Sequence, residues 1–384
     1  MSDAASNITL QTGAASGAVA APELTIVIPT YNERQNVPLM VELVGQVLAG
    51  VAWEIIFVDD DSPDGTALIA NDIGRRDARV RCLRRIGRRG LAGACIEGML
   101  ASQAPYLAVM DADLQHDATL LPRMLDYLKR GPEVIVVGSR YVAGGDAGSG
   151  FSKQRLAASK ISGALAHRFA GVNITDPMSG FFMLRQDVFQ RVAPGLSTQG
   201  FKILLDILAT ANASKGGALR VAELPYVFAA RHAGESKLDT RTVLDFAGLL
   251  IAKATGDALS PRFVNFLFVG LTGVLVHMGM LNLFALAGMG FQPANIAATF
   301  MAMTSNFALN NLITYRDQRL TGLAAIKGLA IFYVICGLGA LSNNGVAHWL
   351  YANQPVWWLA GLSGSVLSAV WNYSISTAFI WGRR

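Results

Sequence analysis

The sequence predicts an α/β domain built around a largely parallel sheet, followed by four transmembrane helices. Residues 23 to about 230 alternate short apolar segments of strand length with amphipathic segments of helix length, which is typical of α/β domains. Beyond residue 262 the chain becomes almost continuously apolar. Only 15% of the 384 residues are charged, whereas a soluble domain has about 25%, so part of this chain is expected to be solvated by lipid.

Four strands and three helices are expected in the α/β domain. Three of the strands end in clusters of polar residues. Because ligands bind beyond the carboxyl ends of the strands in such sheets, these clusters mark the candidate site. The expected strands cover residues 24–29, 53–58, 106–110 and 134–137, and the expected helices cover residues 36–48, 66–76 and 120–129.

Four apolar runs follow, each long enough to cross a bilayer, which takes ~20 residues. They lack the polar outer faces that a soluble helix bundle would need. Asp317, in a loop, is the one acidic residue after residue 260, and Lys327 lies just before the third run, from where its side chain can reach the interface. The runs cover residues 263–287, 291–315, 330–350 and 356–381.

The distribution of basic residues predicts the orientation of these helices. Basic residues lie before the first run, between the second and third runs, and at the end of the chain, whereas residues 288–290 and 351–355 carry no charge. The positive-inside rule therefore predicts a multi-pass protein whose α/β domain and both termini are cytoplasmic, with an aromatic belt on the opposite side. The basic residues are Lys253, Arg262, Arg316, Arg319, Lys327, Arg383 and Arg384, and the belt consists of Trp349, Trp357 and Trp358.

Composition also suggests boundaries between the parts of the chain. Residues 1–22, rich in Ala, Ser and Gly, are expected to form a disordered tail rather than a signal peptide. The α/β domain is expected to cover residues 23–238 and the four-helix domain residues 262–384. Between them, residues 239–261 include apolar residues at helical spacing, which predicts an interfacial helix or, alternatively, a core helix. Residues 153–170 are a second candidate for the interface.

Charge and cysteine usage restrict the partners only weakly. The net charge of +5 suits an anionic partner such as a membrane surface or phosphate groups, and it does not choose between them. Cys82, Cys95 and Cys336 form no closely spaced pair. We therefore expect reduced thiols and no cysteine-based metal site.

The first two strands end in segments suited to binding a nucleoside. After the first strand, Pro29 is followed by Tyr31, whose ring can stack on a base, and by Glu33, which can accept a hydrogen bond from a base or a ribose. An ordinary strand-to-helix loop remains an alternative. After the second strand, residues 59–61 are three successive acids, which are costly to crowd unless they bind donors or a cation. Asp60 is the candidate for the nucleoside, although part of this segment also fits a turn and a helix N-cap.

The third strand ends in MDADLQH, residues 110–116, the most specific short signal in the chain. Asp111 and Asp113 are separated by one residue, so their carboxylates can converge on one cation, with Gln115 as a neutral oxygen ligand. Oxygen ligands alone suit Mg²⁺ or Mn²⁺ bound to a diphosphate. Structural zinc is not expected, because no cysteine is near and His116 stands alone.

Basic residues downstream could neutralise anionic substrates. Arg231 and Lys237 lie in a Gly-rich segment just before the expected interfacial helix. Residues 176–182 predict a turn into an apolar strand, with Ser179 as a possible acceptor contact. The other candidates are Arg140, Arg155 and Lys202, whereas Arg84, Arg85, Arg88 and Arg89 are expected to form a solvated face.

Taken in order, these segments resemble the dolichol-phosphate mannose synthase family, within the inverting family 2 glycosyltransferases of GT-A fold. The resemblance covers residues 24–238 and continues through RFVNFLFVGLTGVLVH into the helical half, which resembles the membrane domain fused to some prokaryotic members. The ordered set of motifs is highly specific. It consists of VIPTYNE, VDDDSPDGT, MDADLQH, VGSRY, MSGFFMLR, GFKILLDIL and RHAGESKL.

The resemblance implies a role for each matching residue. The nucleoside would be held by Pro29, Tyr31, Glu33, Val58 and Asp60. Asp111, Ala112, Asp113 and Gln115 would hold the metal and the diphosphate. Arg140 and Arg155 would meet the lipid phosphate, with Ser159 as a weaker match, and Lys202, Arg231 and Lys237 would meet the diphosphate or the acceptor.

The expected reaction is transfer of mannose from GDP-mannose to the phosphate of a membrane polyprenol, with inversion. A phosphate monoester has a second pKa of about 6, so the acceptor is mostly dianionic at neutral pH and needs no general base. The difficulty is repulsion between two anions. Arg140 and Arg155 would lower this repulsion while the metal stabilises the departing diphosphate.

Three alternatives remain at this point. A related enzyme could use a UDP-sugar, adding glucose or a modified aminosugar, because no residue here distinguishes guanine from uracil. A processive polysaccharide synthase would carry a Gln-x-x-Arg-Trp segment, and the sequence has none. A lipid-sugar flippase with a binding module is disfavoured by the absence of acids within the helices. No nucleic acid partner is expected.

Overall fold

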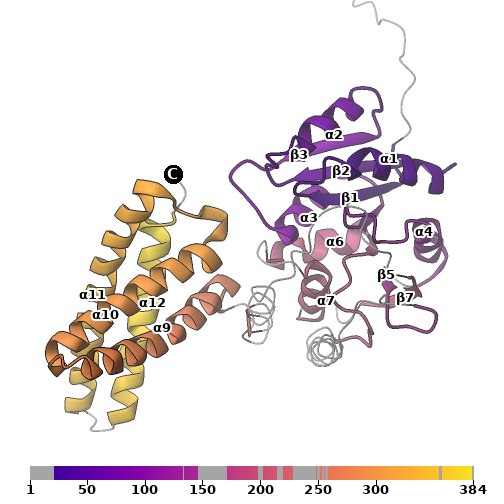
Figure 1. Ribbon diagram of the computed structural model, residues 1–384. Helices are drawn as coiled ribbons and strands as arrows, with labels where there is room; N and C mark the ends of the chain where they lie inside the picture. Colours follow the sequence, from indigo (N-terminus) through magenta and orange to yellow (C-terminus); the bar gives the residue numbers. More distant parts are fainter. Residues whose placement is uncertain are drawn as a thin grey trace, which may run out of the picture.

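The computed structural model describes most of the chain as two bodies, an α/β part and a bundle of long helices (Figure 1). The tail, residues 153–170 and most of residues 239–257 lie outside the described residues, so the expectations for them stay predictions. The described residues are 21–132, 134–145, 171–197, 202–213, 219–227, 248, 251, 252, 255, 258–353 and 357–382.

Within the described residues, seven strands form one mixed sheet in the order β3-β2-β1-β4-β6-β5-β7. β1 to β4 run parallel to one another, and β5 and β7 are also parallel, whereas β6 is antiparallel to both of its neighbours. The strands are β1 (Leu24–Thr30), β2 (Trp53–Asp59), β3 (Val80–Arg84), β4 (Tyr106–Val109), β5 (Ile135–Ser139), β6 (Phe182–Arg185) and β7 (Val221–Pro225).

Helices cover both faces of this sheet because successive strand residues point to opposite faces and both sets are apolar. On β1, Ile26 and Ile28 pack with α1, α2 and α4, whereas Val27 packs with α3, α6 and α7. The result is a three-layer α/β/α arrangement. The helices are α1 (Asn36–Val47), α2 (Thr66–Gly74), α3 (Leu91–Leu100), α4 (Leu120–Arg130), α6 (Gln186–Val192) and α7 (Ile203–Ala213).

The predicted fold class is confirmed, and the elements expected from the sequence are present with small differences at their ends. The apolar strand expected after the turn at residues 176–182 is present as β6. Five of the described elements were not expected, namely β3, α3, α6, α7 and β7. β3 is an edge strand that carries arginines, so it lacks a buried apolar run. α3 is buried on nearly every side and therefore shows no amphipathic periodicity. β6 and β7 are short, and β6 reverses the direction of an otherwise parallel sheet.

The C-terminal half forms two helical hairpins, α9–α10 and α11–α12, drawn in orange to yellow in Figure 1. Ser260 caps α9 by accepting a hydrogen bond from the Phe263 N–H at 3.2 Å, and Pro261 occupies the first helical position. The helices are α9 (Pro261–Leu286), α10 (Phe291–Leu309), a π-helical turn η2 (Asn310–Thr314), a short 3₁₀ turn η3 (Arg316–Gln318), α11 (Gly322–Asn353) and α12 (Trp357–Phe379).

The surface of these helices is apolar, as expected for a protein in a membrane. Large side chains such as Leu275 and Leu286 are exposed, which would be unfavourable in water. In the described part of the chain, two helices have the length and composition of a membrane span: Pro261–Leu286 and Gly322–Leu341.

Two expectations for this half need correction. The second apolar run was expected to be helical to residue 315, but the α-helix ends at Leu309 and continues as a π-helical turn. The third helix begins at Gly322 rather than at residue 330. Lys327 therefore lies on the exposed surface of α11 and not before it, because the preceding residues also favour a helix.

Candidate active site

The polar clusters predicted from the sequence lie along one edge of the sheet. β1, β2 and β4 are parallel, so their carboxyl ends share that edge. β5 ends there too, because β4 and β5 are both antiparallel to β6 and so run in the same direction. β7 also ends there, because it is parallel to β5. β6 starts at the same edge, so the loop that enters it, residues 171–181, joins the cluster.

The backbone of this edge is held in an unusual conformation at three places. Asn32, Asp61 and Leu114 have φ angles of 60°, 57° and 61°, and each lies in the loop that follows β1, β2 or β4. A residue with a side chain in the left-handed region costs about 1–3 kcal/mol, and such strain is concentrated at functional sites. The three loops are therefore held in shape by their surroundings.

Hydrogen bonds join the first loop to the second. The backbone N–H of Asn32 donates to Ser62 Oγ at 2.9 Å, and that of Glu33 donates to Thr66 Oγ1 at 3.0 Å. Asn36 Nδ2 donates to Glu33 Oε2 at 2.7 Å. The predicted nucleoside contact Glu33 thus has a defined carboxylate orientation.

The three successive acids after β2 have different surroundings. Asp59 is fully buried and accepts from the Ser62 N–H at 2.9 Å and from Thr30 Oγ1 at 3.3 Å, so it holds the turn. Asp60, the predicted nucleoside contact, is buried beside it. Asp61 is more exposed and points to Arg84, whose Nε donates to it at 2.7 Å.

Asp60 is bound by two groups from the chain segment that follows β3. Arg85 Nη1 donates to its Oδ1 and the Gly90 N–H to its Oδ2, each at 2.6 Å. Burial raises the pKa of the Asp60 carboxyl, and these two donors oppose that rise. Arg85 Nε also lies 3.3 Å from Glu97 Oε1, so one guanidinium connects two carboxylates.

The expectation that Arg84, Arg85, Arg88 and Arg89 form a solvated face is wrong for Arg85, which is 4% exposed. Arg88 also pairs with Glu97, at 2.7 Å. The physical reason is the acid cluster after β2, whose buried charge needs cations nearby. The acidic run and the arginine run are both visible in the sequence, but only the tertiary structure shows that they are in contact.

Tyr31, the predicted stacking partner of the base, has a cation above its ring. The guanidinium carbon of Arg89 lies 4.6 Å from the ring centroid. This is a cation–π arrangement. A base that stacked on Tyr31 would lie against this guanidinium or replace it.

The predicted metal ligands occupy a tight turn after β4. The Gln115 N–H donates to Asp113 Oδ1 at 3.2 Å, across the left-handed Leu114. Asp111 faces Gly180 at the entry to β6, where a Cβ would lie 3.1 Å from Asp111 Oδ2. No group of three His, Cys, Asp or Glu gathers among the described residues. Two carboxylates and one amide fit Mg²⁺ or Mn²⁺ in their chemistry, since both ions prefer oxygen ligands.

His116 holds the backbone of the turn at Asp111, a role that the sequence did not reveal. The Asp111 N–H donates to His116 Nδ1 at 3.1 Å, so the neutral ring carries its proton on Nε2, 3.8 Å from Asp111 Oδ2. The ring stacks on Phe181 at 5.2 Å and meets the edge of Tyr226 at 5.8 Å. Burial lowers the pKa of His116, which favours this neutral form.

Arg140 and Lys202 bring positive charge to the same edge. Arg140 leaves the end of β5 and pairs with the buried Asp176 through Nε and Nη2, at 2.8 and 3.0 Å. Lys202 precedes α7. Burial lowers the pKa of Lys202 to about 8, helped by the charge of Arg140, while Asp176 and Asp111 act in the opposite direction. The predicted acceptor and diphosphate contacts are thus electrostatically connected to the predicted metal turn.

Comparison with known proteins agrees with this arrangement. Residues 25–193 match the model of glycosyl transferase family 2, and residues 265–381 match the GtrA/DPMS transmembrane domain. The chain is 34% identical over 361 residues to the dolichol-phosphate mannosyltransferase of Pyrococcus furiosus, covering 94% of this chain and 99% of that protein. The chain belongs to the dolichol-phosphate mannosyltransferase family.

Two further relatives match the α/β half. The polyprenol monophosphomannose synthase of Mycolicibacterium smegmatis is 34% identical over 218 residues, which is 56% of this chain and 80% of that protein. The dolichol-phosphate mannosyltransferase of Saccharomyces cerevisiae is 31% identical over 228 residues, which is 58% of this chain and 84% of that protein. The chain is therefore a glycosyltransferase and a membrane protein.

Three of the predicted nucleotide-binding residues are buried at the ends of β1 and β2 and in the turn after β4. Pro29 and Val58 are neighbours in the register of β1 and β2, and both are buried, as is Ala112. They can form the floor of a nucleotide site. Four predicted contacts lie outside the described residues and stay predictions: Arg155, Ser159, Arg231 and Lys237.

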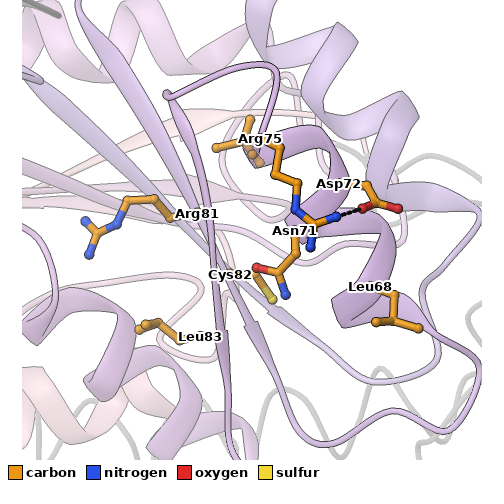
Figure 2. Close-up of a pocket in the computed structure, with 9 residues that line it drawn as sticks. Leu68, Asn71, Asp72, Arg75, Arg81, Cys82 and Leu83 are labelled. Atoms are coloured by element: carbon orange, nitrogen blue, oxygen red, sulfur yellow. Dashed lines mark hydrogen bonds and ion pairs between the residues drawn. The ribbon is translucent and has the colours of Figure 1, made fainter.

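A groove of about 510 Å³ lies elsewhere, between α2 and the edge strand β3 (Figure 2). Asp72 and Arg75 pair at its rim at 2.7 Å. Cys82 lies in its wall, and burial raises the pKa of this thiol to about 12, which disfavours the thiolate at neutral pH. None of the residues predicted to bind the donor, the metal or the acceptor lines this groove.

Proposed function

We propose that this mannosyltransferase-family protein transfers mannose from GDP-mannose to the phosphate of a membrane polyprenol, with inversion at the anomeric carbon. The observation that carries the proposal is the match to the Pyrococcus furiosus dolichol-phosphate mannosyltransferase, because it extends through both the α/β half and the membrane half. A soluble acceptor would not require the second half.

The donor is proposed to lie along the carboxyl ends of β1, β2 and β4. Tyr31, Glu33 and Asp60 would contact the nucleoside. Mg²⁺ or Mn²⁺ would be held by Asp111, Asp113 and Gln115, and when bound it would offset the negative charge of the diphosphate leaving group. His116 supports this assignment, because it accepts a hydrogen bond from the Asp111 N–H and so holds the backbone that carries this carboxylate.

The acceptor phosphate is proposed to approach Arg140, together with Arg155 and Ser159. Two anions must meet for the phosphate oxygen to attack the anomeric carbon while the nucleoside diphosphate departs from the other side. Cations placed in advance lower this repulsion without reorganisation during the reaction. Lys202, Arg231 and Lys237 are proposed to contact the diphosphate or the acceptor.

The membrane half is proposed to cross the bilayer four times, with the α/β half and both termini in the cytoplasm. The basic residues Arg316 and Arg319 between α10 and α11, and the uncharged segment 288–290 after α9, support this orientation. It brings the prenyl phosphate and a cytosolic nucleotide sugar to the same side.

The donor and the acceptor can be tested with purified full-length protein in detergent. Radiolabelled GDP-mannose and UDP-glucose are each supplied with a polyprenol phosphate, with and without a chelator. We expect labelled lipid from GDP-mannose only, abolished by the chelator and restored by Mg²⁺ or Mn²⁺. Exclusive use of UDP-glucose would disprove the donor assignment, and turnover that ignores the chelator would disprove the metal.

Asp113→Asn tests the metal turn directly. Asparagine keeps an oxygen that can accept from the Gln115 N–H, so the fold should persist, but the carboxylate charge is lost. We expect turnover to fall by about 10²–10³-fold, the usual effect of removing one electrostatic contact to the transition state. Asp117→Asn is the matched control, because Asp117 only caps the exposed turn at Thr119. Equal turnover in the two variants would exclude the role of Asp113.

A further inference from the structure

The loop before β6 contains a buried carboxylate to which the motifs assign no role. Asp176 is 1% exposed. Its two oxygens accept from Nε and Nη2 of Arg140, at 2.8 and 3.0 Å. This two-point pairing fixes the plane of the guanidinium as well as its position, which a single hydrogen bond cannot do.

Asp176 is itself fastened to the sheet. Its N–H donates to Glu223 Oε1 on β7 at 3.1 Å, and the Thr175 N–H and hydroxyl donate to the same carboxylate, each at 2.8 Å. The Thr175 hydroxyl also lies 2.8 Å from the hydroxyl of Ser139, which precedes Arg140 on β5. Asp176 is therefore fixed to β7 through Glu223 and, through Thr175, to Ser139 at the end of β5, directly before Arg140.

We propose that Asp176 is a positioning residue, which holds the Arg140 guanidinium in the plane in which it meets the acceptor phosphate. The inference rests on the proposed function. Because the aspartate also offsets the charge of Arg140, the pair contributes direction more than net charge. Net attraction for the phosphate then depends on other cations, such as Lys202.

Asp176→Asn tests this proposal in the full-length protein. The probe is farnesyl phosphate, a short prenyl phosphate whose binding is measured by calorimetry without any sugar transfer. We expect roughly tenfold weaker binding, a change of about 1.4 kcal/mol, with unchanged binding of GDP-mannose. Asp187→Asn is the matched control, since Asp187 pairs with Arg185 on the exposed surface and should bind the probe normally.

A double-mutant cycle separates positioning from a general structural role. In an Arg140→Ala background, Asp176→Asn should cause no further loss, because its effect passes through Arg140. Arg140→Lys, which keeps the charge but cannot pair at two points, should lose about as much binding as Asp176→Asn. If Asp176→Asn does not fold, the binding measured with Arg140→Lys decides whether two-point pairing positions the guanidinium.

Three outcomes would overturn the proposal. These are additive losses in the cycle, normal binding in Arg140→Lys, or a parallel loss of GDP-mannose binding. Failure of the proposed function is distinguishable. Wild-type protein that binds farnesyl phosphate without accepting mannose would reject the reaction while the cycle still decides the role of Asp176. Wild-type protein that does not bind the probe would reject both.

A second inference comes from the membrane helices and does not depend on the reaction. Gly273 of α9 faces Asn306 of α10, and Gly339 of α11 faces Asn372 of α12; a Cβ at either glycine would collide with the asparagine. The members of each pair are 33 residues apart, and the second pair follows the first by 66 residues (339 − 273 = 372 − 306 = 66).

The same shift relates contacts between the two hairpins. Phe266 of α9 meets Tyr373 of α12, with ring centroids 5.6 Å apart. Phe332 of α11 meets Phe307 of α10, with centroids 5.8 Å apart. Phe332 is the 66-residue equivalent of Phe266, and Tyr373 is that of Phe307. The Phe266–Tyr373 contact and the Phe332–Phe307 contact are therefore equivalent, with the roles of the two hairpins exchanged.

The rings of Tyr315 and Trp381, themselves equivalent under this shift, stack on each other with centroids 4.0 Å apart and an interplanar angle of 1°. The Tyr315 hydroxyl lies 2.6 Å from Thr377 Oγ1, and Trp381 Nε1 donates to Asn311 Oδ1 at 3.1 Å. Thr377 is the equivalent of Asn311. A contact between two equivalent residues must lie on the axis that relates the hairpins.

We infer that the membrane half consists of two copies of one helical hairpin, related by a pseudo-two-fold axis through the Tyr315–Trp381 stack. Both copies begin on the same side, so the axis runs along the membrane normal, as in proteins with parallel repeats. α10 and α12 must then cross the bilayer together with α9 and α11, which gives four crossings.

Exchanging the stacked rings tests the symmetry. Tyr315→Trp combined with Trp381→Tyr should keep the thermal midpoint of the detergent-solubilised protein within ~2 °C, because each ring still has its polar partner. Tyr315→Ala and Trp381→Ala should each lower it by several degrees. An exchange as damaging as the alanine variants would overturn the inferred equivalence.

Labelling of introduced cysteines tests the crossings. Gly288→Cys, just after α9, and Asn353→Cys, at the end of α11, should react with an impermeant maleimide from one side of sealed vesicles. Gln318→Cys, between the hairpins, should react from the opposite side. Labelling of Gly288→Cys and Asn353→Cys from different sides would exclude parallel repeats, and the unmodified protein provides the background.

Discussion

Charged side chains at the edge of the sheet are arranged in pairs rather than as separate charges. Asp60 with Arg85 and Asp176 with Arg140 are both buried pairs, at 2.6 and 2.8 Å. Removing one partner of a buried pair leaves an uncompensated charge, which costs more than the pair itself contributes. In both pairs the carboxylate therefore offsets the charge of the buried guanidinium.

Arg85→Ala should strongly destabilise the protein. Asp60 would keep the Gly90 N–H but lose its buried cation, a change that costs about 3–5 kcal/mol. Arg84→Ala, which breaks the more exposed pair with Asp61, should cost only about 0–1 kcal/mol. Thermal midpoints of the two variants provide the measurement. Similar midpoints would show that Arg85 does not hold a buried charge.

Lys202 should make substrate binding depend on pH. Burial lowers its pKa from 10.5 to about 8, so the cation is present below that pH and is lost as the pH rises through about 8. The affinity for the diphosphate donor should fall over the same range. Lys202→Arg, which stays charged, should abolish this dependence. The measurement is the KM for the donor from about pH 6.5 to 9.5. If the affinity of the wild-type protein does not fall over this range, Lys202 does not contact the donor diphosphate.

The stability of the free protein should change in the opposite direction. Protonation of Lys202 is disfavoured in the folded state, whereas the unfolded chain keeps the proton up to its ordinary pKa of 10.5. The unfolded state therefore binds more protons between about pH 8 and 10.5, and the contribution of Lys202 to stability rises with pH in that window.

Among the elements, β6 determines where the site forms. Because it runs antiparallel to β4 and β5, it starts at the edge where those strands end. The loop that precedes it carries Asp176 to Arg140 and Gly180 to Asp111. A parallel β6 would begin at the opposite edge of the sheet and would leave both residues far from the proposed donor site.

α3 packs closely against β1 and β2, the strands that end in the proposed nucleoside contacts. A Cβ at Gly98 would collide with Val27 and would lie 2.8 Å from Val58 Cγ2. Gly98→Ala should therefore destabilise by about 1–3 kcal/mol, the usual cost of overpacking. Gly45→Ala on α1 is the matched control, since its Cβ would meet Trp53 at an ordinary 3.5 Å. Thermal midpoints that fail to separate these variants would show that α3 can move away from the sheet.

For the molecule as a whole, one ion pair fastens the start of the membrane half. Arg262 in the first turn of α9 pairs with Asp317 at 2.7 Å, across the loop between the hairpins, and its guanidinium lies 5.4 Å from the Tyr315 ring. Both side chains are largely buried. The pair therefore joins the first turn of α9 to the loop between the hairpins, beside the Tyr315–Trp381 stack at the centre of the bundle.

Asp317→Asn should loosen this junction. Loss of one charge from a largely buried pair costs about 3–5 kcal/mol, so the thermal midpoint of the full-length protein in detergent should fall clearly. Asp77→Asn, which breaks an exposed pair with Arg79, should leave it nearly unchanged. The opposite order of the two midpoints would contradict a structural role for the Arg262–Asp317 pair.

The sequence by itself determined the features that depend on local pattern. Apolar runs with polar ends predicted β1, β2 and β4, and their shared parallel direction placed Asp60 and Asp111 on one edge. The length of the last apolar runs predicted helices in a membrane. In each of these cases, residues close in the chain carry the physical cause, which is hydrophobic periodicity or the solvation of a long apolar segment.

Only the tertiary structure decided which distant residues meet. Asp60 and Arg85, Arg140 and Asp176, and Tyr315 and Trp381 are each separated by 25 or more residues. Their contacts depend on the reversal of β6, on the path of the chain after β3 and on the packing of one hairpin against the other. Pairing between distant residues follows from how whole elements bury their apolar faces, so the spacing of the residues along the chain does not reveal it.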